Sequence, residues 1–480
     1  MNGLNAVVSG IVDSGVKKVM GVPGYPITEL MDSMGNIKHE WSINEKVALE
    51  MALGSSVCGD RSAVITKHVG MNILSDPLVT CAIHTIGAGV VIFAGDDPGI
   101  EKSQNEQDSR FYGSIAEVPV FDPATPENAY LCVMEAFRLS ETVRTPVIIR
   151  LTDRLLKSTG DIKRKVEKIP IKKLDKKVWL LTMLGKHQRF HAESYPYMCR
   201  YAESLKLNTC EKRGDIGVIS SGFPSQLVDS LVPCEVSHLS LAIVNPLPIE
   251  IIDNFIKDHS KVLVVEETEP VIERQFSKRV LGKLTGHMPY GIVEIGHIQK
   301  ALDNINIDAI KPNVVLQTIE KRGVRPICED CPYLPMYRAI KELDVPVAGD
   351  LGCSIMTSSP PFSLIDAAFS LGSSISTACG FNRKGIAIIG DYGFAHSGIP
   401  ALINAVHNEH EVLVVVLQNE VAAMTGGQKV PDLTGLLDYY IKDTAIVYPA
   451  NQTIIKSLLE TKMKNRGISV LIAKARCPRY

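Results

Sequence analysis

Two short apolar segments in the C-terminal third of the chain, each followed by a polar residue, place the strongest constraint on its fold. Residues 385–389 are apolar and β-branched and lead into Gly390 and Asp391, and residues 411–417 lead to Asn419 in the same way. Segments of this kind are typical of buried strands in a parallel sheet. Because ligands of open α/β sheets bind at the carboxyl ends of the strands, Asp391 and Asn419 are predicted to meet at one ligand-binding edge.

The oxygen atoms that these residues bring to the edge are typical of a site for thiamine diphosphate, where they would hold its diphosphate and a magnesium ion. Mg²⁺ takes octahedral oxygen coordination with few protein ligands, which suits the side chains of Asp391 and Asn419 and the main-chain carbonyl of Val421. The alternative is that Asp391 caps a helix and Asn419 lies in a turn, but the two residues together after two strands favour the diphosphate site. The neighbouring residues predicted to contact the cofactor are Gly390, Tyr392 and Gly426.

Length, charge and cysteine content indicate a multidomain protein that binds neither nucleic acid nor a membrane. A chain of 480 residues suggests three domains at about 100–200 residues each. A net charge of -2 provides no electrostatic attraction for nucleic acid or an anionic membrane. The apolar segment 82–94 is too short for a membrane span and carries His84, and no basic-then-apolar leader follows Met1. Eleven cysteines without a secretory leader predict a reducing, cytoplasmic location.

The order of strand-like and helix-like segments predicts an α/β protein with three domains. Short apolar runs alternate with helical stretches over the first part of the chain, then charge rises, with one helix expected around 197–205. Strands at 216–219 and 262–265 predict a smaller second α/β domain. The predicted division is a first domain at 1–156, a linker at 157–213, a second domain at 214–315 and a third at 322–480.

The aminopyrimidine end of thiamine diphosphate needs a carboxylate. In thiamine chemistry a glutamate hydrogen-bonds the pyrimidine so that its amine can remove the thiazolium C2 proton. Glu45 begins a helical pattern and is the candidate. The alternative is a capping box, with Ser42 as the N-cap and Glu45 at the third helical position.

Five further segments carry a pattern that extends over nearly the whole chain. They are 40–53, Lys-His-Val-Gly-Met-Asn at 67–72, Ser-Gln-Asn-Glu-Gln-Asp-Ser-Arg at 103–110, 265–270, and Gly-Asp-Leu-Gly-Cys at 349–353. In this order they resemble the large subunit of indolepyruvate:ferredoxin oxidoreductases, which are thiamine-dependent 2-oxoacid:ferredoxin oxidoreductases.

The resemblance implies a fold, a reaction and partners. It implies a pyrimidine domain first, a transketolase C-terminal-like domain second and a diphosphate domain last, with Glu45 as the pyrimidine glutamate and Gly24 and Tyr25 in a cofactor-contacting loop. The implied reaction is oxidative decarboxylation of a 2-oxo acid with an aryl or bulky side chain to an acyl-CoA, with electrons passed to ferredoxin. A smaller subunit would share coenzyme A binding and electron exit in a dimer of heterodimers.

Four cysteines match the order in which related enzymes hold a [4Fe-4S] cluster, which would take up the electrons of decarboxylation one at a time. These are Cys328, Cys331, Cys353 and Cys477. Zinc and plain buried thiols are the alternatives, and Cys379 is a rival fourth ligand. The scattered cysteines Cys58, Cys81, Cys132, Cys199, Cys210 and Cys234 are expected to be buried hydrophobic residues.

The chain departs from the family pattern at three places. It ends at Tyr480 without a ferredoxin-like domain, so we expect electrons to leave through another polypeptide. Tyr25 replaces a substrate-contacting threonine, although Thr28 lies three positions on. Glu329 and Asp330 inside the cysteine pair predict a low cluster potential.

Three other side chains are candidates for the site. His68, after Lys67, is expected to face the thiazolium or to be a structural histidine. Arg110 is expected to pair with the substrate carboxylate or only with a surface acid, and His396 to contact the diphosphate or cap a helix. Alternative functions are a non-oxidative 2-oxoacid decarboxylase, which the loop at 21–24 also resembles, and a catalytically silent subunit.

Overall fold

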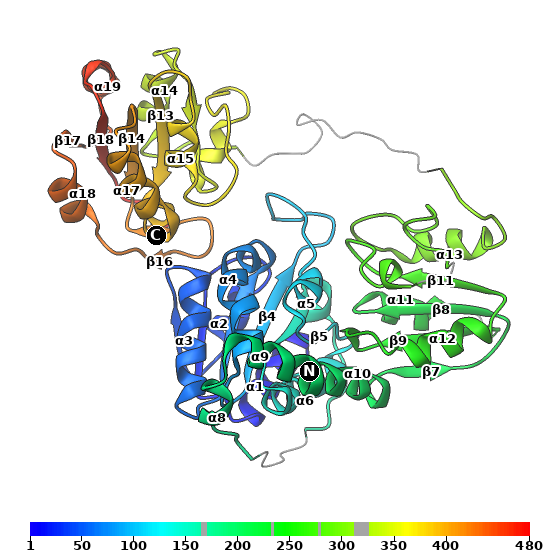
Figure 1. The fold of residues 1–480 in the computed structure, drawn as a ribbon. Helices are drawn as coiled ribbons and strands as arrows, with labels where there is room; N and C mark the ends of the chain where they lie inside the picture. Colours follow the sequence, from blue (N-terminus) through cyan, green and yellow to red (C-terminus); the bar gives the residue numbers. More distant parts are fainter. Residues whose placement is uncertain (165–169, 232–234, 277–279, 312–325) are drawn as a thin grey trace. The chain divides into compact units, whose positions relative to one another are not determined.

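The computed structural model describes residues 1–480 apart from 165–169, 232–234, 277–279 and 312–325 (Figure 1). The chain forms two compact units, Met1–Asn313 and Val314–Tyr480. Among the described residues, no helix has the length and apolar character needed to cross a membrane.

A seven-stranded sheet organises the first unit. Its order is β10-β5-β6-β4-β3-β1-β2, parallel except that β10 runs antiparallel to β5. The strands are β1 (Lys18–Gly21), β2 (Lys38–Trp41), β3 (Ser62–Lys67), β4 (Val90–Asp96), β5 (Val120–Phe121), β6 (Val147–Thr152) and β10 (Ile243–Asn245). The mainly parallel α/β sheet predicted for this part of the chain is confirmed.

Helices cover both faces of this sheet because its strands are apolar on both sides. Val19 and Phe93 point into a core closed by α1 (Gly3–Asp13) and α6 (Pro126–Val143). Their neighbours Met20 and Ile92 point the other way, into a core closed by α3 (Glu45–Val57) and α4 (His68–His84). The shorter helices are α2 (Thr28–Asp32), α5 (Phe111–Ala116) and α7 (Asp153–Lys157). The loops after β1, β3 and β4 therefore meet at one edge of the sheet.

A four-stranded sheet forms the rest of the first unit, with order β11-β8-β9-β7 and only β7 antiparallel. Its strands are β7 (Thr209–Glu211), β8 (Ile216–Ser221), β9 (Val236–Leu241) and β11 (Lys261–Val265), and its helices are α11 (Pro224–Leu231), α12 (Ile249–Lys257) and α13 (Ile295–Asp303) (Figure 1). The next strand along the chain after β9, β10, leaves this sheet and joins the seven-stranded one. The stretch predicted as a second domain is therefore joined to the first sheet by a shared strand.

The stretch predicted as a linker contains helices and contributes to the first core. They are α8 (Lys176–Trp179), α9 (Met183–Arg189) and α10 (Tyr195–Ser204), and α10 confirms the helix expected around 197–205. Phe190, Met198 and Ala202 are buried in the core beneath α1 and α6.

The second unit is a five-stranded parallel sheet with order β12-β13-β14-β18-β17. Its strands are β12 (Val347–Ala348), β13 (Gly385–Gly390), β14 (Val412–Gln418), β17 (Thr444–Val447) and β18 (Ile468–Lys474). One face is covered by α14 (Leu334–Lys341) and α19 (Gln452–Lys464), and the other by α15 (Ser374–Cys379) and α17 (Ile399–His407). Two further α-helices are described in this unit, α16 (Asp391–Gly393), which follows β13 directly, and α18 (Thr434–Tyr440), which lies before β17. The two apolar segments at 385–389 and 411–417 are thus adjacent parallel strands, as predicted.

Candidate functional site

The edge of the second unit joins the ends of β13 and β14 through Asp391. Asp391 follows β13, and its Oδ2 accepts hydrogen bonds from the main-chain N–H groups of Asn419 (3.0 Å) and Glu420 (2.6 Å), which follow β14. The Asn419 Oδ1 accepts a hydrogen bond from the Val421 N–H at 3.1 Å. The geometry therefore brings Asp391, Asn419 and Val421 together at one strand edge.

Burial changes the pKa of the Asp391 carboxyl at this edge. Asp391 is 7% exposed, and its burial raises the pKa of the carboxyl to about 6 although main-chain N–H groups oppose the shift. A cation beside the carboxylate would stabilise its charged form. Carboxylate, amide and main-chain oxygens are the donors that Mg²⁺ prefers, so this set of residues fits a magnesium-bound diphosphate.

Asp350 is a second buried carboxylate at this edge, and the sequence analysis assigned it no role. It lies two residues after β12, is completely buried, and accepts a hydrogen bond from the Gly372 N–H at 2.5 Å. Its Oδ2 has no hydrogen-bond partner among the described residues, and a Cβ on Gly393 would overlap that atom. Burial raises the pKa of Asp350 to about 6. A strand followed by Gly-Asp, the pattern that identified Asp391, is the signal that also marks Asp350.

The other residues predicted to contact the diphosphate surround this edge. The main-chain N–H of Tyr392 donates to Asp391 Oδ1 at 2.9 Å, and His396 is 7% exposed with its Nδ1 2.6 Å from the Ser397 hydroxyl. Gly426 has a φ of +126°, a conformation that glycine adopts readily. Their contacts with a cofactor stay predictions.

Glu45 lies at the carboxyl edge of the seven-stranded sheet. It is the first residue of α3 and is 6% exposed, and a Cβ on Gly70, in the first turn of α4, would overlap its carboxylate. The capping-box alternative is wrong, because the N-cap is Asn44, whose side chain accepts the Lys46 N–H at 2.8 Å. The hydroxyl of Ser42 is buried without a hydrogen-bond partner among the described residues.

The loop after β1 is held in place by its own side chains. The Thr28 hydroxyl donates to the Gly24 carbonyl (3.0 Å) and accepts the Gly24 N–H (3.1 Å), so it closes the turn. The Tyr25 hydroxyl donates to Glu101 at 2.8 Å, and the Lys102 ammonium lies over the tyrosine ring. In this structure neither Thr28 nor Tyr25 presents an unengaged hydroxyl to a substrate.

His68 begins α4 and is 1% exposed. Its Nδ1 lies 3.3 Å from the Gly95 carbonyl and its Nε2 3.2 Å from the Asn105 carbonyl, while burial lowers its pKa. A neutral imidazole carries only one N–H, so it can donate to only one of these two carbonyls. The ring is therefore held between two loops at this edge, with one nitrogen left as an acceptor.

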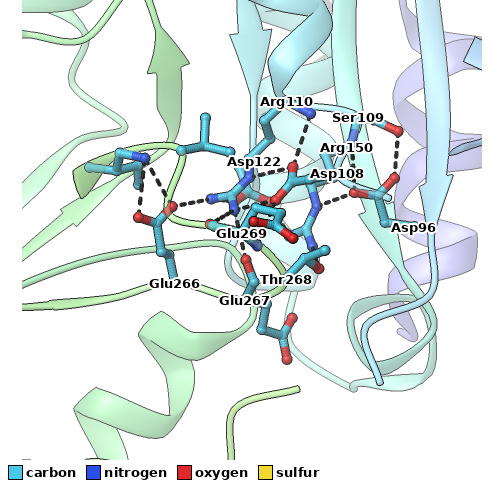
Figure 2. Close-up of polar contacts among 12 residues, drawn as sticks. Asp96, Asp108, Ser109, Arg110, Asp122, Arg150, Glu266, Glu267, Thr268 and Glu269 are labelled. Atoms are coloured by element: carbon cyan, nitrogen blue, oxygen red, sulfur yellow. Dashed lines mark hydrogen bonds and ion pairs between the residues drawn. The ribbon is translucent and has the colours of Figure 1, made fainter. Parts of the chain in front are cut away.

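Arg110 is completely buried in an ionic network that joins the two sheets of the first unit (Figure 2). Its guanidinium pairs with both carboxylate oxygens of Asp108 (2.9 and 2.6 Å) and with Glu266 Oε2 (2.9 Å). It also donates to the main-chain carbonyls of Glu267 and Glu269. Arg110 thus binds acidic residues of the protein, but they are buried, so the expectation of a surface acid is wrong. Its pairing with a substrate carboxylate stays a prediction.

The four predicted cluster ligands lie in the second unit, and all are partly exposed. Cys328 and Cys477 both raise the pKa of Cys331, which burial brings to about 11. Cys331 and Cys353 pack against the same core, beneath α14 and α19, whereas the rival Cys379 packs against the core on the opposite face of the sheet. Within the described residues, no group of three or more His, Cys, Asp or Glu side chains is arranged to hold a metal ion.

The expectation for the scattered cysteines is partly wrong. Cys81 and Cys132 are buried, and Cys199 is half-buried, but Cys58 and Cys210 are exposed. Cys58 is the C-cap of α3 and Cys210 lies on the edge strand β7, positions that face solvent. Cys234 lies outside the described residues.

Comparison with known proteins gives a consistent result. The family model for the thiamine pyrophosphate enzyme C-terminal TPP binding domain matches residues 350–448, which include Asp350, Asp391 and Asn419. The indolepyruvate oxidoreductase subunit IorA of Methanothermobacter marburgensis is 34% identical over 90% of this chain and 76% of its own length. The Archaeoglobus fulgidus subunit of the same name is 31% identical over 99% of this chain and 86% of its own length. A solved 2-oxoglutarate:ferredoxin oxidoreductase from Magnetococcus marinus is 16% identical, with a TM-score of 0.49 over 59% of this chain and 61% of its own.

Proposed function

Because the chain belongs to the family of the indolepyruvate oxidoreductase subunit IorA, we propose that it oxidatively decarboxylates 2-oxo acids with aryl or bulky side chains. It is a thiamine-diphosphate-dependent oxidoreductase of 2-oxo acids. In the proposed reaction the acyl group passes to coenzyme A, CO₂ leaves, and two electrons pass to ferredoxin. Cys328, Cys331, Cys353 and Cys477 would hold a [4Fe-4S] cluster, which would supply one-electron transfer. A smaller subunit would complete the enzyme as a dimer of heterodimers.

The strand edge at Asp391 is the observation that carries this proposal. Asp391, Asn419 and the Val421 carbonyl would hold the magnesium ion, and the carboxylate already links the ends of β13 and β14. Bound thiamine diphosphate supplies an electron sink for the loss of CO₂. Glu45 would hydrogen-bond the pyrimidine, a role that its burial at the start of α3 supports.

The product separates the proposed reaction from its alternative. The purified chain, combined with its smaller subunit under anaerobic conditions, is expected to reduce ferredoxin only when indolepyruvate and coenzyme A are both present. An aldehyde product formed without ferredoxin reduction would instead establish a non-oxidative decarboxylase.

Glu45→Gln is expected to leave thiamine diphosphate binding largely in place but to slow deuterium exchange at the thiazolium C2. The amide cannot take up and return the proton that the pyrimidine needs, and loss of such a group slows proton transfer by about 10²-fold or more. Quenched-flow NMR measures the exchange. Glu50→Gln, on the exposed side of the same helix, is the matched control. Exchange at the wild-type rate in Glu45→Gln would show that Glu45 has only a structural role.

The proposed cluster makes a separate prediction. Anaerobically reconstituted chain is expected to contain about four irons and to give an electron paramagnetic resonance signal after dithionite reduction. Replacing Cys328, Cys331, Cys353 or Cys477 by serine should shift or abolish the signal, because thiolates are the ligands. Cys379→Ser, on the other face of the sheet, should not. Reconstituted chain with neither iron nor signal would contradict this electron path.

A further inference from the structure

Lys67 is a buried cation at the edge that carries Glu45, and no described residue pairs with it. It is the last residue of β3 and the N-cap of α4, and it is 9% exposed. Among the residues that the structure describes, its ammonium group makes no hydrogen bond and no ion pair within 4.0 Å. Buried lysines are usually paired, so an unpartnered one requires an explanation.

The loop after β1 is shaped to hold the stem of this side chain. A Cβ on Gly24 would lie 3.0 Å from the Lys67 Cβ and 3.1 Å from its Cδ, so the aliphatic chain lies directly on the glycine. The Nζ atom does not belong to the polar atoms that are completely buried without a hydrogen-bond partner, so it keeps some contact with solvent. The side chain is therefore fixed along its stem while its charged end stays within reach of a ligand.

The charge of Lys67 is only partly compensated by its neighbours. Burial lowers the pKa of Lys67 to about 8, and the charge of Asp97 opposes this shift. Asp97 itself accepts hydrogen bonds from the N–H groups of Glu101 and Lys102 and from the Ser103 hydroxyl. An anion bound to the ammonium group would stabilise the charged lysine.

The start of α4 adds a second attraction for an anion at the same place. The N-cap of this 17-residue helix is Lys67 itself, whose side chain makes no capping hydrogen bond. A helix N-terminus also carries partial positive charge. The carboxylate of Glu45 lies against Gly70 in that turn, which puts the lysine beside the residue proposed to activate the cofactor.

We propose that Lys67, beside the N-terminus of α4, binds the carboxylate of the 2-oxo acid substrate. This inference rests on the proposed function and assigns the substrate-carboxylate partner to a residue other than Arg110. The guanidinium of Arg110 is already engaged by Asp108 and Glu266, whereas the ammonium of Lys67 is not engaged by any described residue. The lysine selects for the charge of the acid and leaves the side chain of the acid to be selected elsewhere.

Calorimetric titration with an unreactive acid tests this assignment. The probe is 3-phenyllactate, a 2-hydroxy acid, and its neutral counterpart is 3-phenylpropane-1,2-diol, in which a hydroxymethyl group replaces the carboxylate. Lys67→Met in the full chain with thiamine diphosphate and Mg²⁺ is expected to weaken phenyllactate binding by about tenfold or more, since a charged hydrogen bond is lost. Diol binding should not change, and Lys67→Arg should bind the acid within about threefold of wild type.

Lys102→Met is the matched control, because Lys102 belongs to the same edge but its side chain is 58% exposed. It should bind phenyllactate as the wild type does. The thiamine diphosphate affinity of Lys67→Met, measured in the same titrations, reports whether the cofactor site is intact. Wild-type chain that binds thiamine diphosphate but not phenyllactate, or a Lys67→Met chain that binds the acid normally, would overturn the assignment while leaving the proposed function in place.

Chemical protection tests the assignment without the cofactor. Reductive methylation with formaldehyde, followed by peptide mass spectrometry, is expected to label Lys67, and phenyllactate but not the diol should slow that labelling. Equal labelling rates with and without the acid would contradict the inference. Because this measurement needs no thiamine diphosphate, its result stands even if the chain fails to bind the cofactor and the proposed function is wrong.

Discussion

Replacing Asp391 by alanine is expected to abolish measurable binding of thiamine diphosphate and Mg²⁺. The carboxylate is the only charged member of the proposed ligand set, and it also holds the N–H groups of Asn419 and Glu420. Its loss removes a metal ligand and releases the loop that carries the other two. Both effects act on the same site, so the expected loss of affinity is large.

Two further variants separate these effects. Asp391→Asn keeps one oxygen, which can still accept the N–H groups of Asn419 and Glu420, but lacks the charge, and it is expected to lose the metal as well. Asp438→Ala removes an exposed carboxylate from the same unit and should bind normally. Calorimetric titration measures the affinities and circular dichroism the fold. A folded Asp391→Ala chain within about threefold of the wild-type affinity, roughly 0.65 kcal/mol, would show that Asp391 is not a metal ligand.

The strands and their shared edges could be predicted because they are fixed locally. A buried parallel strand needs an apolar, β-branched segment, and the residue that ends it must lie at the carboxyl edge. The segments at 385–389 and 411–417 therefore gave both the strands and the meeting of Asp391 with Asn419. The same rule applies to Asp350, whose strand β12 has only two residues and is too short to stand out as a pattern.

Features that depend on distant contacts could not be predicted in this way. Strand β10 belongs by sequence to the second sheet, yet it pairs with β5, because pairing is decided by which edge is open. The helices α8 and α9 have little apolar periodicity, but the chain following α9 buries Phe190 in the first core. The choice between Ser42 and Asn44 as N-cap is a difference of two residues, within the usual uncertainty of a helix end.

The roles of Arg110 and Lys67 show why charge alone does not identify a binding residue. Arg110 pairs with Glu266, which is 156 positions away, and no local pattern indicates that contact. Lys67 is buried by a loop from β1 and has no described partner. In the sequence, Lys67 follows a predicted strand and Arg110 lies in a segment that resembles the family, and neither position indicates the contacts of its side chain. Only the three-dimensional contacts show that one is engaged and the other is not.

Arg110→Met is expected to lower the free energy of unfolding of the first unit by about 3–5 kcal/mol. Removing one member of a buried ionic network leaves its partners charged and unpaired in a medium of low polarity. Asp108 and Glu266 would lose their closest cation, and Arg150, which pairs with Asp96 at 2.6 Å, is already engaged (Figure 2). Urea unfolding followed by circular dichroism measures the change.

The exposed pair of Arg138 with Glu135 is the matched control, and Arg138→Met should change the free energy of unfolding by less than about 1 kcal/mol. Adding Glu266→Gln to Arg110→Met should cost less than the sum of the two single changes, because the second change removes a carboxylate that the first left unpaired. If Arg110 instead bound the substrate, Arg110→Met would unfold like the wild type and lose phenyllactate binding. The combination of stability and acid binding therefore distinguishes a cation that holds two sheets together from one that holds a ligand.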